Sequence, residues 1–128
     1  MHHAIFLCFA LLIPIVFLGG CTPSASDAYH KITPAEAHEM MKKEDIILID
    51  VREEGEYKAG HIPGACLIPL GTIDSTVTAK LPDKKKPLIV YCRSGVRSKK
   101  AAMKLVELGY TDVWDMGGIL DWPYEVEK

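Results

Sequence analysis

Pro87-Leu88-Ile89-Val90-Tyr91-Cys92-Arg93-Ser94-Gly95-Val96-Arg97 is the stretch of this 128-residue chain with the most distinctive local pattern. Its first five residues form a continuous apolar run, which is typical of a strand covered on both faces. Residues 98–108 follow, with apolar side chains at the helical spacing of Ala101, Ala102, Leu105 and Leu108. The sequence therefore predicts a strand, then a loop that begins at Cys92, then a helix.

Other segments of the chain repeat this alternation of strand and helix. A helix is predicted from Thr33-Pro34-Ala35-Glu36 to about Lys43, because a hydroxyl N-cap precedes proline and an acid in the first turn. The remaining expected elements are strands at 46–49, 66–68 and 112–115, a short helix at 53–59, a weak helix at 72–80 and a terminal turn or helix at 119–122. This order predicts an α/β fold, a largely parallel central sheet flanked by helices with its site at the carboxyl ends of the strands.

The composition limits the function classes. The chain has 15 Lys and Arg against 17 Asp and Glu, a net charge of −2, and 48% hydrophobic residues. Such a chain is too short for two full domains and too apolar for a disordered protein. It also lacks the basic excess of a dedicated nucleic-acid binder, so we expect no nucleic acid among its partners.

The N-terminal segment predicts export. Residues 1–20 contain no charged side chain, and the apolar run from Ala4 to Leu18 is interrupted by Pro14. Leu18-Gly19-Gly20-Cys21 resembles the bacterial lipobox, which implies a lipoprotein signal peptide at 1–20 and lipidation of Cys21. We expect a flexible tether at 21–27 and a folded domain at 28–128, held by the lipid anchor to a bacterial membrane on its extracytoplasmic side, in the periplasm or at the cell surface. An uncleaved membrane anchor is the alternative.

Cys92 is the predicted nucleophile. A cysteine between a buried strand and a helix faces the free N–H groups at the helix start, which favour the thiolate form. Residues 80–104 add nine basic side chains against Asp83 alone, so anions should be attracted to this region. Arg93 and Arg97 lie within the loop, whereas Lys84-Lys85-Lys86 are better interpreted as a solvated turn.

The loop Cys92-Arg93-Ser94-Gly95-Val96-Arg97-Ser98 resembles the active loop of the rhodanese sulfurtransferases. Two other parts of the chain resemble the family's N-terminal and C-terminal signatures, in the expected order. They are Asp50-Val51-Arg52-Glu53 with Tyr57, residues 60–65 and residues 68–70, and then Gly117-Gly118-Ile119-Leu120-Asp121-Trp122. The resemblance covers nearly all of residues 30–124 and implies a single rhodanese-like domain.

The resemblance implies a persulfide mechanism. Cys92 would attack the outer sulfur of an anionic donor such as thiosulfate and pass that sulfur to a thiol or another thiophilic acceptor. The amides of Arg93, Ser94, Gly95, Val96, Arg97 and Ser98 would surround the sulfur, and the side chains of Arg93 and Arg97 would receive the donor's oxyanions. The family pattern places Asp50 and Arg52 near the base of the loop, where they either brace it as an ion pair or take part in the chemistry.

Two other functions remain as alternatives. Cysteine-dependent phosphatases resemble this arrangement but place one residue more between cysteine and arginine, and here that position is Ser98. The second alternative is a non-enzymatic module that carries sulfur or binds a redox or respiratory partner. Under this alternative, a redox or sulfur-relay protein is a further partner. We expect no cofactor and no metal, because no cysteine and histidine pattern has metal-ligand spacing.

Cys66 and the histidines carry weaker predictions. Cys66 is expected to be a small buried residue, and the alternative is a resolving cysteine that forms a disulfide with Cys92. His61 is predicted to be a structural hydrogen-bonding residue, and His30 and His38 to be surface residues.

Overall fold

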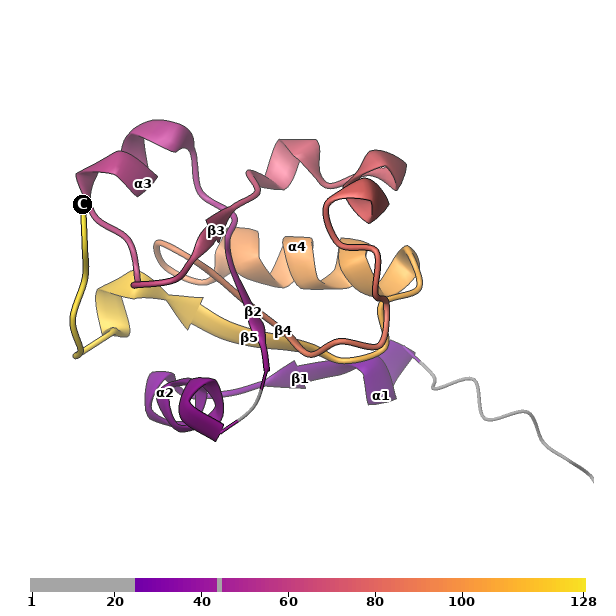
Figure 1. Cartoon of the computed structure of the whole chain (residues 1–128), viewed down its shortest axis with the longest axis horizontal. Helices are drawn as coiled ribbons and strands as arrows, with labels where there is room; N and C mark the ends of the chain where they lie inside the picture. Colours follow the sequence, from indigo (N-terminus) through magenta and orange to yellow (C-terminus); the bar gives the residue numbers. More distant parts are fainter. Residues whose placement is uncertain (1–24, 44) are drawn as a thin grey trace, which may run out of the picture.

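The computed structural model describes residues 25–43 and 45–128. Its sheet has five strands in the order β1-β5-β4-β2-β3, and every adjacent pair is parallel (Figure 1). The predicted α/β class with a parallel sheet is therefore confirmed. The strands are β1 (Tyr29–Lys31), β2 (Ile47–Asp50), β3 (Cys66–Leu67), β4 (Leu88–Cys92) and β5 (Val113–Gly118).

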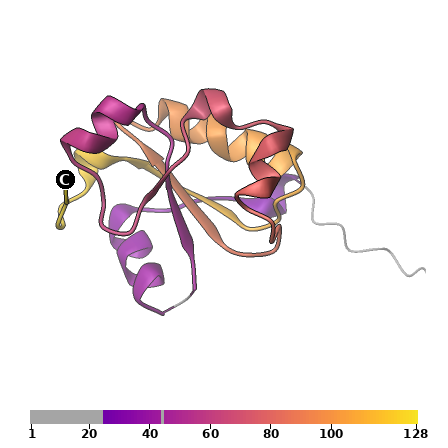
Figure 2. The same ribbon diagram turned by 45° about the horizontal axis from the view of Figure 1, so that its top comes forward.

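Helices cover both faces of this sheet. Helix α4 lies on one face and helix α2 on the opposite one, as the two views show (Figures 1 and 2). Thr33 caps α2 as expected, since its Oγ1 accepts a hydrogen bond from the Glu36 amide at 3.1 Å. The helices are α1 (Ala25–Ala28), α2 (Pro34–Lys43), α3 (Glu54–Ala59) and α4 (Val96–Glu107), with 3₁₀ segments η1 (Leu70–Thr72), η2 (Ser75–Ala79) and η3 (Ile119–Asp121).

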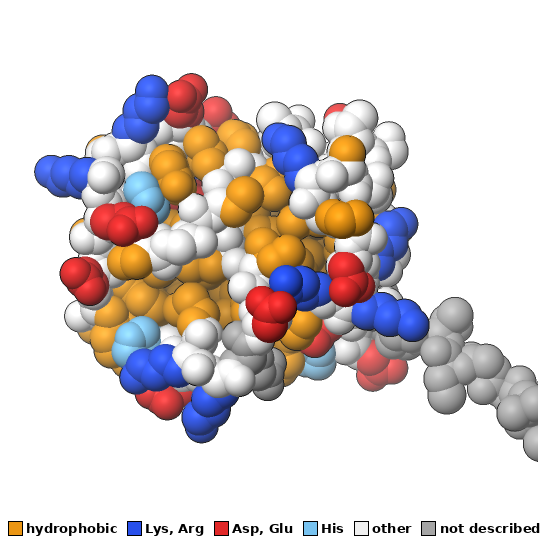
Figure 3. All heavy atoms as spheres, viewed as in Figure 1, with side chains coloured by type: hydrophobic (Ala, Val, Ile, Leu, Met, Phe, Trp, Pro, Cys, Tyr) orange, Lys and Arg blue, Asp and Glu red, His pale blue; other side chains and the backbone are white. Residues whose placement is uncertain are grey.

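The core consists of two clusters, one on each face of the sheet. Alternate residues of β4 enter different clusters, because successive side chains of a strand point to opposite faces. Val90 and Cys92 pack with Leu105 of α4, whereas Ile89 and Tyr91 pack with Ala37 of α2. In Figure 3, hydrophobic side chains gather in the middle of the visible surface, and most of the charged ones lie toward its edges.

The register between β4 and β5 shifts once, next to the predicted site. Val90 pairs with Asp115, but Tyr91 pairs with Gly117, so Met116 is the extra residue of a bulge. The shift places Gly118 opposite Cys92. The glycine pair therefore lies directly beside the loop that follows β4.

Several boundaries differ from the prediction. Helix α4 begins at Val96, two residues before the expected start, and β5 continues to Gly118 instead of ending at Asp115. The segment predicted as a weak helix over 72–80 forms the 3₁₀ segment η2, in which Asp74 caps the amide of Thr76. Strand β1 was not predicted, because it is a three-residue edge strand without a long apolar run.

The predicted tether and anchor lie mostly outside the described residues. The signal peptide, the Cys21 lipidation site and residues 21–24 all belong to that part of the chain. Residues 25–27, also expected to be flexible tether, form the first three residues of α1, which ends at Ala28. Within the described ranges, none of the helices is long and apolar enough to span a bilayer.

Candidate active site

Cys92 lies at the carboxyl end of β4 and is 1% exposed. The next turn of chain brings the Gly95 amide back to the sulfur, and this N–H donates to Cys92 Sγ at 3.0 Å. Gly95 has a φ of +111°, a left-handed conformation that favours glycine, and it is the N-cap of α4. The loop therefore holds the sulfur at the start of a twelve-residue helix, as predicted.

Hydrogen bonds to two backbone carbonyls hold the loop in this shape. Ser98 Oγ donates to the Gly95 carbonyl at 3.0 Å, and the Leu120 amide donates to the Arg93 carbonyl at 3.2 Å. Gly118 packs so closely beneath the loop that a Cβ there would overlap the Arg93 carbonyl. Within the described ranges Gly95 is the one amide that donates to Sγ, so the wider ring of amides stays a prediction.

The two loop arginines have different surroundings. Arg93 is exposed, and no ion pair forms to it from the described residues. Arg97 instead donates from both terminal nitrogens to Glu56, at 2.6 Å to Oε1 and 2.9 Å to Oε2. Hydrogen bonds from Arg97 lower the pKa of Glu56 from its ordinary 4.5 to about 2, and those same bonds raise the pKa of Arg97. Arg97 thus already holds an anion, supplied by α3.

Asp50 and Arg52 form a buried ion pair at the end of β2. Asp50 accepts from the Arg52 amide and from both Nε and Nη2 of its side chain, the last at 2.8 Å. Tyr91 also donates to Asp50, at 2.8 Å, and accepts from the Ile62 amide at 3.1 Å. Arg52 donates in addition to the Gly60 carbonyl at 2.7 Å. This network ties the end of β2 and the turn after α3 to the residue before Cys92.

The contacts of this network shift the pKa of Arg52 and of Tyr91. Burial by itself lowers the pKa of Arg52, but hydrogen bonding and attraction to Asp50 raise it overall. Burial, followed by the Asp50 charge, raises the pKa of Tyr91, so its phenol stays protonated and remains a donor. The contacts therefore favour the bracing role over direct chemistry.

Cys66 differs from its prediction. It is exposed on the edge strand β3, so the expectation of a buried core residue is wrong. Its Cα pairs with Ile49, which pairs with Val90, so β2 separates the strands of Cys66 and Cys92. Two strand spacings amount to about 9.6 Å, whereas a disulfide requires Cα atoms within about 7 Å. This register does not permit a Cys66–Cys92 disulfide.

The other predicted polar residues have structural contacts. His61 lies 2.8 Å through Nδ1 from the Tyr57 carbonyl and stacks on the Tyr57 ring, in agreement with a structural role. Lys84 donates to the Leu108 carbonyl at 2.8 Å, which satisfies an acceptor at the end of α4. No group of three or more histidine, cysteine and acidic side chains suitable for a metal occurs within residues 25–43 and 45–128.

Four residues of the site were not identified as site residues from the sequence. Glu56 contacts Arg97 across 41 positions, and Tyr91 contacts Asp50 across the same separation, so neither pair leaves a local pattern. Gly118 and Leu120 belong to the quoted C-terminal signature, which was a usable signal, but only the β5 register shows that they support the loop.

The fold and the site define an α/β domain with a cysteine at the start of a helix, beneath a loop backed by a glycine pair. The family model of the rhodanese-like domain matches residues 33–124. The chain therefore belongs to the rhodanese-like domain family.

Similar proteins carry more than one described activity. The chain is 36% identical over 95 residues to a thiosulfate sulfurtransferase GlpE of Coxiella burnetii, covering 73% of this chain and 87% of that protein. It is 33% identical over 106 residues to a tRNA uridine(34) hydroxylase of Enterobacter, covering 79% of this chain but 30% of that protein. A solved rhodanese with anions from E. coli matches with a TM-score of 0.61 and 36% identity, over 66% of this chain and 99% of that one.

Proposed function

We propose that this protein is a sulfurtransferase that carries sulfane sulfur on Cys92. The observation that carries the proposal is the sulfur of a buried cysteine, held at 3.0 Å by the Gly95 amide at the start of α4. An amide donor in that position stabilises negative charge on the cysteine sulfur and on a sulfur attached to it. The similarity to thiosulfate sulfurtransferases supports the same reaction class.

With thiosulfate as donor, the Cys92 thiolate attacks the outer sulfur. The new bond joins Sγ to that sulfur, the bond between the two donor sulfurs breaks, and sulfite leaves with its electron pair. Arg93 is the cation available for the leaving oxyanion, because Arg97 is paired with Glu56. A thiolate acceptor then attacks the outer sulfur of the persulfide and restores the Cys92 thiolate.

A non-enzymatic sulfur carrier or partner-binding module is the second candidate. The tRNA uridine(34) hydroxylases support it, because this chain spans less than a third of a protein with another described activity. Under this candidate Cys92 would bind sulfur, or hold the loop shape, without rapid turnover.

Mass spectrometry of the intact full chain, before and after thiosulfate, tests the proposal. We expect the mass to increase by one sulfur, which cyanide then removes as thiocyanate. Cys92→Ala should gain no sulfur, and an unchanged melting temperature shows that this variant is folded. Removal by cyanide separates a persulfide from the addition of two oxygens, which has nearly the same mass. A folded, reduced sample that gains no sulfur from thiosulfate or polysulfide contradicts the proposal. Loading followed by very slow turnover with every thiol acceptor favours the carrier.

We also propose that Cys21 anchors the domain to a membrane on its extracytoplasmic side. The uncharged run followed by Leu18-Gly19-Gly20-Cys21 supports this location. Incorporation of labelled palmitate into the full chain in bacterial cells, and its loss in Cys21→Ala, is the expected result. Equal labelling of the two proteins contradicts it.

A further inference from the structure

The exposed hydrophobic side chains of this protein are not placed evenly. Among the described residues, the two most exposed large hydrophobic side chains are Leu120 at 65% and Val96 at 64%. Both adjoin the cysteine loop, since Val96 begins α4 and the Leu120 amide donates to the Arg93 carbonyl. Thiosulfate and small thiols do not need apolar surface at the mouth of a site. A larger partner does.

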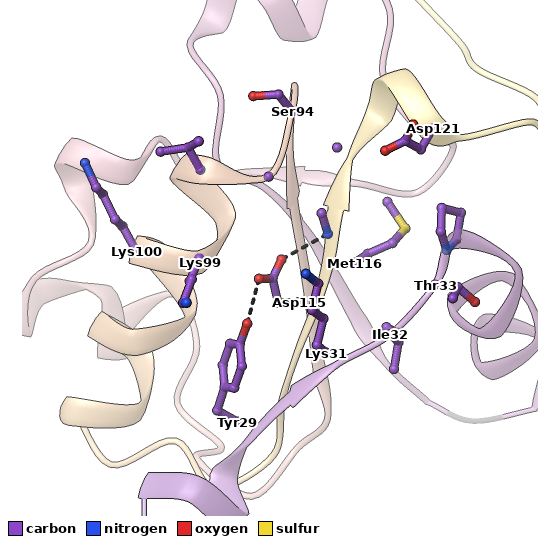
Figure 4. Close-up of a pocket in the computed structure, with 15 residues that line it drawn as sticks. Tyr29, Lys31, Ile32, Thr33, Ser94, Lys99, Lys100, Asp115, Met116 and Asp121 are labelled. Atoms are coloured by element: carbon purple, nitrogen blue, oxygen red, sulfur yellow. Dashed lines mark hydrogen bonds between the residues drawn. The ribbon is translucent and has the colours of Figure 1, made fainter.

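A hollow of about 730 Å³ opens from the same loop (Figure 4). The loop backbone, the ends of β1 and β5 and the first turns of α4 line it, and Ile32 and Met116 supply apolar surface. Lys31, Lys99 and Lys100 also border this hollow. Lys99 and Lys100 border in addition a second hollow, of about 530 Å³, on another side of α4.

The charge of this region is mainly positive. Lys31, Lys99 and Lys100 are exposed, and none of them forms an ion pair within residues 25–43 and 45–128. Two carboxylates also border the first hollow. Asp115 is buried and accepts from the Tyr29 hydroxyl at 2.9 Å and the Gly117 amide at 3.0 Å, whereas Asp121 is exposed. Three lysines therefore face solvent here against one exposed carboxylate, because Asp115 is already satisfied.

We propose that Val96, Leu120, Lys31, Lys99 and Lys100 form an acceptor surface for an acidic protein that presents a thiol to Cys92. This inference rests on the proposed function. The apolar pair would contact the segment around the acceptor thiol, and the lysines would attract its acidic flanks. The exposed apolar side chains are aliphatic and offer no ring for base stacking, which favours a protein over a nucleic acid.

The step on this surface is a transfer of one sulfur atom. The acceptor thiolate attacks the outer sulfur of the Cys92 persulfide and forms a bond to it. The bond between that sulfur and Sγ breaks, and its electron pair returns to Cys92 as thiolate. The acceptor leaves as the persulfide, so charge and sulfur balance without another oxidant or reductant.

Two synthetic peptides test this surface. Each carries one central cysteine between leucines, and its flanks contain either glutamates or glutamines at the same positions. Full-length protein is first loaded with sulfur, and its mass is checked, so that failure to load counts against the proposed function and not against the surface. The rate of sulfur transfer to each peptide is then measured at low and high salt.

We expect the glutamate peptide to react about tenfold faster at low salt and to lose this advantage at high salt, because screening removes the attraction. Lys99→Glu with Lys100→Glu should abolish the advantage, and Leu120→Ser should slow both peptides several-fold. The matched control is Lys42→Glu with Lys43→Glu on α2, which changes net charge equally and should retain the advantage. Transfer to uncharged 2-mercaptoethanol should be unchanged in Lys99→Glu/Lys100→Glu.

Equal rates for the two peptides on a loaded protein would overturn the inference. An equal loss of the advantage in the α2 control would also overturn it, because net charge alone would then explain the effect. If the protein shows no preference between the peptides but binds a short RNA through Lys99 and Lys100, the surface is a nucleic-acid site instead.

Discussion

Both terminal nitrogens of Arg97 donate to the carboxylate of Glu56, at 2.6 Å and 2.9 Å, so α3 supplies an anion to the cysteine loop. The same carboxylate accepts from the Glu53 amide at 3.2 Å and so caps its own helix. The Glu56 side chain thus caps the start of α3 and also pairs with the guanidinium of Arg97 in the loop.

Replacing Glu56 by glutamine should strengthen donor binding. Glutamine keeps an oxygen for the Glu53 amide but removes the charge that competes with thiosulfate for Arg97. We expect the KM for thiosulfate to fall about two- to fivefold with little change in kcat, the size expected for a partly exposed ion pair. Glu54→Gln on the same helix is the control, because Glu54 pairs with Lys58 instead. Equal KM values in the two variants would contradict the prediction.

The ion pair should also give the fold a defined pH dependence. The pKa of Glu56 is lowered from 4.5 to about 2, so its stabilising contribution is complete above pH 4.5 and is lost as the pH falls toward 2. We expect wild type to be more stable than Glu56→Gln at pH 7, and this difference to shrink over that window in urea unfolding. When Glu56 and Glu56→Gln are compared in an Arg97→Met background, the difference in stability between them should no longer change with pH. A difference that stays constant down to pH 2 would exclude this linkage.

Gly118 should tolerate no side chain. A Cβ there overlaps the Arg93 carbonyl, so Gly118→Ala should displace the loop and destabilise the fold by about 1–3 kcal/mol. Persulfide formation should fall by more than tenfold, since the Gly95 amide would no longer reach Sγ. Gly55→Ala in α3 is the matched control, because its Cβ meets nothing within 4 Å. Full sulfur loading in Gly118→Ala would show that the loop adapts.

The Tyr91 hydroxyl should matter for stability. Tyr91→Phe leaves the Ile62 amide and one Asp50 oxygen without this partner, which should cost about 1–3 kcal/mol in the free energy of unfolding. Tyr124→Phe, at a partly exposed ring, should change stability by less than about 0.5 kcal/mol. Similar unfolding curves for the two variants would show that this hydroxyl does not brace the site.

Cys66 should react as an independent surface thiol. In native protein it should be alkylated much faster than Cys92, which is 1% exposed. Mild oxidation followed by peptide mapping should yield no Cys66–Cys92 linked peptide, because β2 lies between their strands. Recovery of that linked peptide from folded protein would require a rearrangement of the sheet.

The sequence was most informative where one segment determines its own structure. The apolar run before Cys92 and the helix after it are such a unit, and the structure moves their predicted boundaries by no more than two residues, with β4 at Leu88–Cys92 and α4 at Val96–Glu107. The same holds for the Thr33 cap of α2. These features depend on neighbours a few residues apart, which pattern and capping rules describe.

Features that depend on the register of the sheet were not predictable in this way. The strand was predicted to end at Asp115, yet pairing with β4 through a bulge extends β5 across Gly117 and Gly118. Strand β1 is stabilised by its parallel pairing with β5 and not by its own composition. Glu56 lies in a segment that predicts only a short helix, and its partner becomes apparent only when α3 and α4 are placed together.

The alternation of side chains along β4 separates chemistry from support. Tyr91 points into the cluster that contains Ala37 and Met116, and Cys92 points into the one that contains Leu105. The backbone of β4 therefore lies between the Asp50 ion-pair network and the Cys92 sulfur, which gains and loses an atom in the proposed reaction. We expect an added sulfur atom to lie on the side of the sheet that Cys92 faces, opposite to Tyr91, so that the proposed transfer requires no rearrangement of the charges that hold the strand ends together.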